Sequence, residues 1–439
     1  MNYSLYIHIP FCVHRCAYCD FNTYAGQEES IPAYVNALCN EIEFVGRSFP
    51  FPAGEGPQVA PPAAGSVVDK VHTIFFGGGT PSLLLPDQVD AILQSIRKHF
   101  ALTEDVEITI EANPGTVDPE QLRSLHSAGI NRISFGVQSA NVEELRMLER
   151  AHDFFDVINS MNWARRAGFD NLNLDLIYGL PEQTLQSWQA TVNRILELHP
   201  DHISAYALTL EHGTPFGRWT SRGLMPVPDP DLAADMYEWA SDAFISAGYL
   251  QYEISNWALN AGNKVTGGES GSPSHHTPSF ACRHNLQYWR GLPYLGFGAG
   301  AHGYANGFRY SNVLRIKTYI DRLTAAGVQF ADLSFPLSPA VVNHHRQTLQ
   351  DNMSEYMITG LRLTREGISA PAFHQKFGRN LMDVYGKEIG ELIRFGLLEW
   401  HKETSEVPAE YPSAETPEVL RLTRRGRLLG NQVFMRFVG

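Results

Sequence analysis

Short apolar runs alternate with longer stretches of helical spacing over the first 250 residues. The first run, residues 5–10, predicts a short buried strand. Further strands are predicted at residues 71–76, 106–110, 132–135, 173–177, 203–208 and 252–254, and helices at residues 31–44, 119–128, 154–167, 184–198 and 232–247. Strands that alternate with helices in this way indicate a parallel sheet wrapped by helices.

Three of the predicted helices end in Ala-Gly followed by an apolar residue, at residues 128–130, 167–169 and 247–249. A glycine at this position is typical of a helix that ends abruptly and leads directly into a strand. About six strand–helix units can be counted, fewer than the eight of a closed barrel. We therefore predict an α/β fold whose first domain, residues 1–250, is a partial (β/α)6 TIM-like barrel.

The pattern changes from about residue 340. Helices are predicted at residues 354–363 and 381–395, followed by a strand at 397–400, a polar loop and a strand at 419–423. This order predicts a small helical, winged-helix-like domain over residues 340–439. A short basic run lies near its end (Arg421, Arg424, Arg425 and Arg427), but the loop before it is acidic. We expect a packing or lid domain rather than a DNA-binding one.

Two segments interrupt the alternation. Residues 47–69 are rich in Pro, Gly and Ala, and residues 260–280 are rich in Gly, Ser, Thr and Pro. The first predicts a flexible surface insertion and the second a disordered insertion. The second lies inside an extension, residues 251–335, that separates the two domains.

Composition narrows the class of protein. The 439 residues carry a net charge of −13, which argues against a general nucleic-acid binder. No apolar run is long enough to cross a bilayer, and the N-terminus does not resemble a signal peptide. An odd number of cysteines, five, is typical of a reducing compartment, so we expect a cytoplasmic protein.

Three of the five cysteines follow the first predicted strand. Cys12, Cys16 and Cys19 have C-x3-C-x2-C spacing, with aromatic residues around them. Three thiolates would bind three irons of a 4Fe–4S cluster and leave the fourth iron open for a ligand. A zinc site that uses His14, or three unrelated thiols, are the alternatives.

Glycines and polar residues lie at the ends of the next strands. Gly77, Gly78 and Gly79 precede Thr80 and let the backbone approach a ligand closely. Glu111, Gln138 and Asp175 lie at or near the carboxyl ends of predicted strands, and Arg150 lies in the segment that follows. Carboxylates and amides suit a ribose and an adenine edge, and an arginine suits a carboxylate. The structural alternatives are that Glu111 pairs with Arg132 and that Asp175 caps a turn.

The cysteine spacing together with Tyr18 resembles the signature of radical SAM enzymes. Residues from about 3 to 320 resemble the branch of that superfamily that contains the coproporphyrinogen III dehydrogenase HemN and the heme chaperone HemW. The shared segments, in chain order, are YIHIPFC, GGGTP, IEANP, GVQS and LDLIYGLP. The winged-helix-like domain is also one that this family carries.

The resemblance implies the ligands of S-adenosylmethionine (SAM). Tyr6, Gly78, Glu111 and the cluster match positions that hold one SAM. In the dehydrogenase, a second SAM is lined by positions that match Tyr18, Gly79, Thr80, Gln138, Arg150 and Asp175. Whether a second SAM binds is left open.

Two features separate the two branches. The dehydrogenase has a fourth cysteine two residues after the third, where this chain has Phe21. The heme chaperones carry H-N-x-x-Y-W, which stands here as His284, Asn285, Tyr288 and Trp289 with two residues between. A neutral imidazole is a good axial ligand of heme iron, and the two aromatic rings could stack on a porphyrin.

Other assignments of the hexapeptide stay open. Asn285 could orient the imidazole or bind a propionate, and Cys282 and His302 are alternative ligands. The structural alternative is a hydrogen-bonded loop histidine beside core aromatic residues.

We predict a heme chaperone that binds a 4Fe–4S cluster, SAM and heme, and delivers heme to an acceptor protein, either membrane-associated or a heme-storage protein. The alternative is an oxygen-independent coproporphyrinogen III dehydrogenase, which Phe21 disfavours. A binding protein with a vestigial SAM site is the third class. Whether the chain is an enzyme, and whether it forms a homodimer, is left open.

Overall fold

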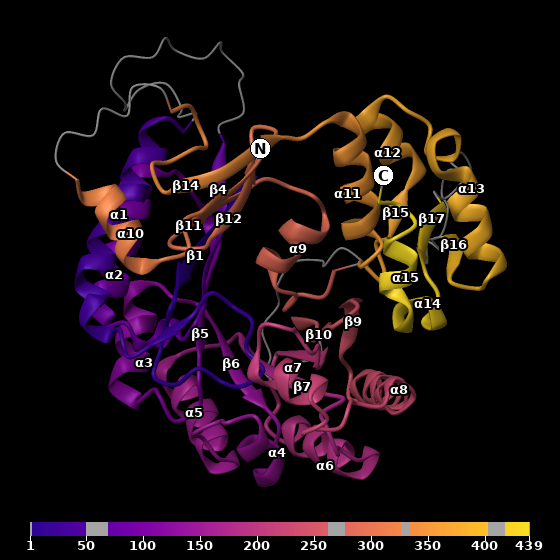
Figure 1. Ribbon diagram of the computed structural model, residues 1–439, viewed down its shortest axis with the longest axis horizontal. Coiled ribbons are helices and arrows are strands. Elements are labelled where there is room, and N and C mark those ends of the chain that lie inside the picture. The colour runs from indigo at the N-terminus through magenta and orange to yellow at the C-terminus, as the bar shows by residue number, and fades with distance from the viewer. Residues whose placement is uncertain (1, 50–68, 262–276, 326–332, 403–417, 439) are drawn as a thin grey trace. The chain divides into compact units, whose positions relative to one another are not determined.

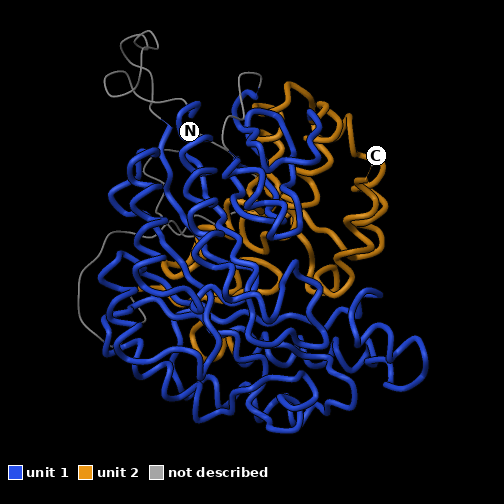
Figure 2. Tube along the Cα trace, turned by 60° about the vertical axis from the view of Figure 1, so that its left-hand side comes forward, with its two compact units in different colours: residues 1–243, 292–346 blue, residues 244–291, 347–439 orange. Residues whose placement is uncertain are grey.

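A computed structural model describes residues 2–49, 69–261, 277–325, 333–402 and 418–438 (Figure 1). Most of the predicted insertions at 47–69 and 260–280 lies outside these ranges. The chain divides into two compact units (Figure 2). The first contains residues 1–243 and 292–346, and the second contains residues 244–291 and 347–439. The domain boundaries drawn from the sequence stay predictions.

The sheet of the first unit is built around six parallel strands in chain order. They are β1 (Asn2–Ile9), β4 (Lys70–Gly78), β5 (Leu102–Ala112), β6 (Arg132–Gln138), β7 (Leu172–Tyr178) and β8 (His202–Ala207). On the other side of β1 lies β11 (Tyr294–Phe297), also parallel, followed by the antiparallel strands β12 (His302–Ala305), β13 (Phe308–Asn312) and β14 (Val341–Arg346). The predicted partial barrel of six parallel strands is confirmed.

Helices lie along the outer side of these strands (Figure 1). They are α1 (Ile31–Arg47), α2 (Pro86–His99), α3 (Pro119–Ala128), α4 (Val142–Met147), α5 (Phe154–Ala167), α6 (Leu185–Leu196), α8 (Pro230–Ser246), which ends just inside the second unit, and α10 (Ile316–Thr324). Helix α7 (Pro215–Ser221) packs instead against the cysteine loop, where Phe216 N donates to Ala17 O at 3.1 Å. The predicted glycine stops are confirmed, since Gly129 and Gly168 end α3 and α5 with φ of 108° and 104°. Helix α2 was missed, although its buried residues (Val89, Ile92, Leu93 and Ile96) have helical spacing.

Strand β1 shows how the sheet separates its core from the site. Leu5, Ile7 and Ile9 are fully buried, while Tyr6 and His8 project from the opposite face and are joined by a hydrogen bond. Successive side chains of a strand point to opposite faces. The short run of residues 5–10 therefore contains both a core face and a polar face.

One buried carboxylate ties α1 to the strands and helix that follow residue 292. Glu41 is fully buried and accepts hydrogen bonds from Gly298 N at 2.9 Å, Asn312 Nδ2 at 2.8 Å, Tyr319 Oη at 2.6 Å and Ser338 Oγ at 2.6 Å. Burial raises the pKa of Glu41, and these donors oppose the rise. A carboxylate with four donors is a well-compensated buried charge.

We expect Glu41→Ala to destabilise the protein by roughly 3–5 kcal/mol, because several buried donors lose their acceptor at once. Glu43→Ala is the matched control, since Glu43 lies on the same helix and pairs only at the surface with Arg47. That change is expected to cost under about 0.5 kcal/mol. Urea unfolding followed by circular dichroism measures both. Equal free energies of unfolding for the two variants would contradict the assigned role of Glu41.

The second unit contains the hairpin of β9 (Leu250–Glu253) and β10 (Asn256–Ala258) and the helix α9 (Arg283–Trp289). Its C-terminal part consists of α11 (Leu349–Gly360), β15 (Ile368–Ser369), α12 (Ala370–Phe377), α13 (Leu381–Arg394), β16 (Leu398–Lys402), β17 (Glu418–Leu422), α14 (Arg424–Leu428) and α15 (Gly430–Phe434). The small antiparallel sheet β15-β17-β16 packs with the helices around one apolar core. This arrangement matches the predicted winged-helix-like domain.

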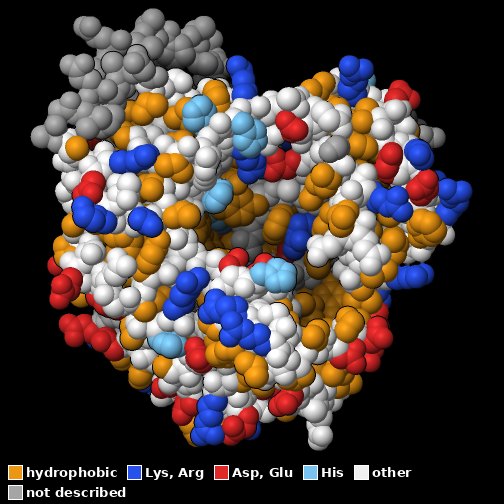
Figure 3. Space-filling view, in the orientation of Figure 1, with side chains coloured by type: hydrophobic (Ala, Val, Ile, Leu, Met, Phe, Trp, Pro, Cys, Tyr) orange, Lys and Arg blue, Asp and Glu red, His pale blue; other side chains and the backbone are white. Residues whose placement is uncertain are grey.

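Acidic and basic side chains are interspersed on the face that Figure 3 shows. No helix of the described residues combines the length and apolar character that a membrane span requires.

Candidate cofactor site at the carboxyl ends of the strands

The three cysteines lie on a loop that two short parallel strands hold, β2 (Phe11–Cys12) and β3 (Tyr24–Ala25). Cys12 is buried, Cys16 and Cys19 are partly buried, and all three thiols are free. Each sulfur lies near a polar side chain. The partners are Thr80 Oγ1, 3.8 Å from Cys12 Sγ, Arg150 Nη1, 3.6 Å from Cys16 Sγ, and Thr23 Oγ1, 3.9 Å from Cys19 Sγ. Donors of this kind stabilise thiolates that ligate a metal.

The charge balance of the loop suits a metal-bound state. Burial raises the pKa of the Cys12 and Cys19 thiols, and the neighbouring sulfurs raise it further. A positively charged centre reverses this, because thiolates must be deprotonated to ligate. Among the described residues, no three His, Cys, Asp or Glu side chains form a group that could hold a single metal ion.

The glycine triplet lets the end of β4 lie against β1 and the cysteine loop. A Cβ on Gly79 would stand 2.5 Å from Phe11 O and 3.0 Å from Cys12 Sγ. A Cβ on Gly78, whose φ is +116°, would stand 2.5 Å from the His8 ring. Both glycines are needed for this close approach, so the triplet is more than a tight turn.

Glu111, Tyr6 and His8 form the polar face beside the triplet. Gly78 N donates to Glu111 Oε2 at 3.1 Å. Tyr6 Oη lies 3.0 Å from His8 Nδ1, and His8 Nε2 lies 3.0 Å from Asn22 O. The carbonyl can only accept, so we assign the imidazole proton to Nε2 and infer that Tyr6 donates to Nδ1. Burial lowers the pKa of His8, so the ring is neutral.

Glu111 has an unusual protonation equilibrium. Its pKa is raised to about 8, first by burial and then by the nearby Asp175 carboxylate, while the hydrogen bond from Gly78 N and the charge of Arg132 lower it. Arg132 lowers the pKa of Glu111 and is the smallest of these influences, so the suggested pairing of the two residues stays a prediction. The carboxyl is largely protonated at neutral pH unless a cation lies beside it.

We expect the stability of the cofactor-free protein to fall as pH rises from about 4.5 toward 8, since the folded state holds the Glu111 proton more tightly than the unfolded chain does. Glu111→Gln should remove this part of the decline, so the variant gains on the wild type with increasing pH. Tm at pH 6 and pH 9 measures the difference. A constant Tm difference at both pH values would contradict the raised pKa.

Arg150 joins the cysteine loop to strands β5 and β6. Its Nη2 donates to Asn113 Oδ1 at 2.5 Å and to Gly136 O at 2.6 Å, while Nη1 points at Cys16 Sγ. Asn113 Nδ2 in turn donates to Thr80 Oγ1 at 3.0 Å. Arg150 Nε is buried and has no hydrogen-bond partner within the described ranges. This orphaned donor is what a site that binds a carboxylate would present.

Two residues at this end of the sheet have strained backbone conformations. Gln138 and Glu149 have φ of 69° and 55°, in the left-handed region that non-glycine residues rarely adopt. Gln138 ends β6, and Glu149 holds His14 Nε2 at 3.0 Å. Backbone strain of this kind concentrates at ligand sites. The structure thus brings Gln138 and Arg150 to the same end of the sheet as the cysteines.

Asp175 and Tyr18 complete the site residues drawn from the sequence. Asp175 accepts hydrogen bonds from Ser134 Oγ at 2.7 Å and from Asn173 Nδ2 at 2.8 Å. It lies within β7 and does not cap a turn. Burial raises the pKa of Tyr18, which the nearby Arg150 guanidinium opposes. Cys16, Cys19 and Asp175 also influence the pKa of Tyr18, so both side chains lie on the side of the sheet that faces the cysteine loop.

Sequence reasoning missed His8, Asn22 and Asn113 as site residues. Asn113 lies two residues after Glu111, and His8 two residues after Tyr6. A side-chain period of two along a strand would have identified both. Asn22 has no such signal, because it lies on the loop. It anchors the loop instead, since its Nδ2 donates to Ala299 O at 3.0 Å.

The H-N-x-x-Y-W segment forms α9 in the second unit. His284 is 1% exposed, and its Nε2 lies 2.9 Å from Tyr288 Oη. The two side chains meet because residues four apart share a helix face. Cys282, the alternative ligand, is fully buried before the helix. His302 is exposed on β12 of the first unit.

One face of the Trp289 ring packs against an arginine side chain. The Arg362 guanidinium lies 4.2 Å from its ring centroid, and Arg362 Nη2 lies 3.3 Å from the fully buried Glu253. The Trp289 Nε1 atom is buried and unpartnered within the part of the chain that the structure describes. A fixed ring with a free N–H suits a ligand that is apolar with a polar edge.

Comparisons with known proteins agree with these features. Residues 6–195 match the family model of the radical SAM superfamily, and residues 347–406 match that of the HemN C-terminal domain. The heme chaperone HemW of Bacillus subtilis (strain 168) is 36% identical over 437 residues, 99% of this chain and 99% of its own. HemW of Escherichia coli (strain K12) is 39% identical over 302 residues, 68% of this chain and 69% of its own. The structure of coproporphyrinogen III oxidase HemN from Escherichia coli superimposes on this one with a TM-score of 0.75 at 23% identity. The match covers 99% of this chain and 90% of HemN, and it shows that the two share a fold.

Proposed function

Since the chain belongs to the HemW family of radical SAM proteins, we propose that it binds a 4Fe–4S cluster, SAM and heme and delivers heme to an acceptor protein. The family implies the cluster and SAM. The residues that hold each group, and the delivery itself, are the proposal. It is supported most directly by α9, which presents His284, Tyr288 and Trp289 on one short helix.

Cys12, Cys16 and Cys19 would hold the cluster, and Thr80, Arg150 and Thr23 would support their sulfurs. Glu111 and Tyr6 flank Gly77, whose Cβ would stand 3.2 Å from Glu111 Oε2 and 3.0 Å from the Tyr6 ring. They would contact SAM there, and a nearby ammonium would ionise Glu111. A cluster with bound SAM supplies one-electron reduction of the sulfonium.

Arg150 would orient a carboxylate, because its guanidinium is fixed by Asn113 and Gly136. Tyr18, Gly79, Gln138 and Asp175 would line the rest of the site. Whether they surround a first or a second SAM stays a prediction.

The proposal is tested by titrating heme into the anaerobically reconstituted protein while the same preparation is assayed with coproporphyrinogen III. We expect a saturable Soret shift and no decarboxylated product. Formation of protoporphyrinogen IX would favour the alternative, the oxygen-independent dehydrogenase. Absence of both would leave a SAM-binding protein. SAM cleavage to 5′-deoxyadenosine by the reduced protein separates that third class from the others.

The dehydrogenase alternative is disfavoured by one residue. Phe21 stands where that branch has a fourth cysteine, and 68% of its surface is exposed. An exposed phenyl ring can neither ligate iron nor transfer a proton. It fits an apolar ligand or partner surface instead.

We expect Tyr288→Phe to tighten heme binding by about fivefold, because His284 Nε2 must leave the Tyr288 hydroxyl before it ligates iron and one hydrogen bond is worth about 1 kcal/mol. Soret titration measures the dissociation constant. Tyr385→Phe is the control, since Tyr385 Oη makes similar contacts, 3.3 Å from Ser354 Oγ, within the C-terminal core. Weaker binding by Tyr288→Phe would instead identify the tyrosine as a heme contact.

A further inference from the structure

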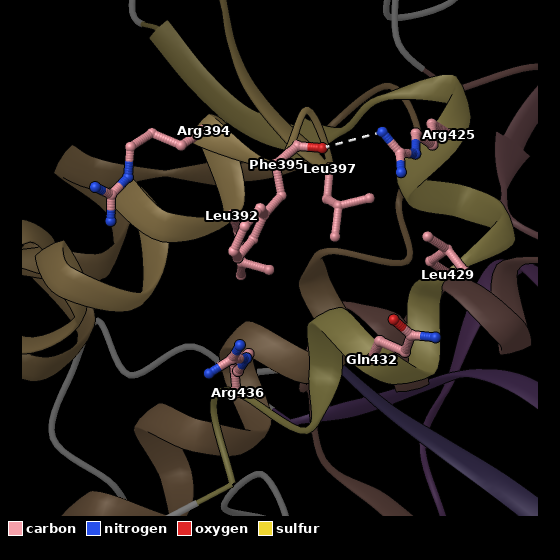
Figure 4. A pocket seen from close by; sticks show the side chains of 8 residues that line it. All are labelled: Leu392, Arg394, Phe395, Leu397, Arg425, Leu429, Gln432 and Arg436. Carbon is pink, nitrogen blue, oxygen red and sulfur yellow. Dashed lines mark hydrogen bonds between the residues drawn. The ribbon is translucent and has the colours of Figure 1, made fainter.

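A pocket of about 420 Å³ opens on the C-terminal domain and is lined by none of the site residues assigned above (Figure 4). Its lining consists of Leu392, Arg394, Phe395, Leu397, Arg425, Leu429, Gln432 and Arg436. These residues come from the end of α13, the following turn, α14, α15 and the segment after α15. Four of the eight are apolar and three are arginines. An apolar floor with a cationic rim is unusual for a chain whose net charge is −13.

The floor and rim differ in exposure. Leu392 and Leu397 are buried, but 56% of Phe395 is exposed. In Figure 4, Leu392, Phe395 and Leu397 face Leu429 and Gln432, while Arg425 and Arg436 stand at two edges and Arg394 extends outward. An exposed phenyl ring between arginines has the composition of an interaction hot spot.

The arginines are only weakly engaged. Arg436 Nη1 lies 3.8 Å from Glu391 Oε2, and the two side chains are 52% and 30% exposed. Arg425 Nη1 lies 3.5 Å from Phe395 O. Neither contact contributes much stability, so both guanidinium groups can turn to an external carboxylate.

We propose that this pocket docks an acidic segment of a partner protein, with one apolar side chain of the segment inserted between Phe395 and Leu429 and carboxylates paired with Arg425 and Arg436. Charge complementarity selects the carboxylates, and the apolar floor selects the anchor. The lining offers no His, Cys, Met or Tyr, so a heme would find no axial ligand here. The inference rests on the proposed function only in identifying the partner as the heme acceptor.

The test measures fluorescence anisotropy of short fluorescein-labelled peptides with the full chain. One peptide carries a single Phe flanked by Glu residues, a second replaces the Phe by Ser, and a third replaces the Glu residues by Lys. We expect saturable binding of the first alone. Arg425→Gln with Arg436→Gln should weaken it at least about tenfold, and Phe395→Ser at least about fivefold.

Matched controls come from the same domain. Arg379→Gln with Lys387→Gln removes the same charge at exposed positions outside the pocket, and Met382→Ser removes an exposed apolar side chain. Both should bind the first peptide as the wild type does. Equal binding of the Ser peptide would reduce the pocket to a nonspecific cationic surface, and no binding of any peptide would overturn the proposal.

A heme titration of the same variants separates the two proposals. Heme binding that survives in the Arg425→Gln, Arg436→Gln variant while peptide binding is lost supports a docking pocket distinct from the heme site. If hemin displaces the peptide from the wild type, and if this variant no longer binds hemin, the pocket is a heme site and the docking proposal is overturned. Absence of heme binding in every protein would contradict the chaperone function but leave the peptide result intact.

Discussion

Cys16→Ser is expected to abolish assembly of the 4Fe–4S cluster, lowering the iron content of the anaerobically reconstituted protein from about four atoms per chain to near zero. The serine hydroxyl stays protonated where a thiolate is required, and Arg150 Nη1 then faces a neutral oxygen instead of sulfur. Iron and acid-labile sulfide analysis measures the effect, together with loss of the broad visible absorption. Loss of any one of the three cysteines should remove as much function, because SAM would lose its open iron.

Cys39→Ser is the matched control. Cys39 is a partly buried residue of α1, and its Sγ lies 3.9 Å from Ala91 O. It is also far from the cysteine loop in the sequence. Its replacement should leave iron and sulfide unchanged. Zinc in stoichiometric amount in the wild type, with little iron after reconstitution, would contradict the cluster and restore the metal-ion alternative.

Periodicity predicted the parallel strands of the first unit well, because each carries a long apolar run between a helix end and a turn. It failed after residue 250. The predicted strand at 252–254 is half of an antiparallel hairpin, β9–β10, and does not extend the parallel series. Strands β11 to β14 were not predicted at all. Short strands such as β12 contain glycine, tyrosine and histidine, and their strand state depends on pairing with neighbours rather than on local preference.

The candidate site could also be predicted only in part from the sequence. The sequence identified Glu111, Gln138, Arg150 and Asp175 because they follow apolar runs. It gave no indication that Arg150 points at Cys16, or that Asn113 joins Arg150 to Thr80. These contacts link residues more than thirty positions apart, and only the register of the strands determines them. The hydrogen bond between His284 and Tyr288 was not predicted either. The segment was interpreted as a loop, whereas the structure forms the helix α9 there.

His284→Ala is expected to weaken heme binding by at least about a hundredfold, because an axial ligand contributes more to affinity than the outer partners that support it. The Soret shift of the heme-loaded protein should be lost at concentrations that saturate the wild type. His284 is 1% exposed, so the substitution also leaves a cavity beside Tyr288. Unfolding curves must therefore show that the variant remains folded.

Adding free imidazole to His284→Ala distinguishes the loss of a heme ligand from misfolding of the variant. A free imidazole that enters the cavity should restore part of the Soret shift in His284→Ala, which a structural defect would not allow. Cys282→Ala and His302→Ala are the controls, and both should bind heme as the wild type does. A shift that survives in His284→Ala but disappears in one of these variants would move the ligand to that residue. Because His302 belongs to the first unit, a ligand there would also change which part of the chain contacts heme, whereas Cys282 lies immediately before the helix that carries His284.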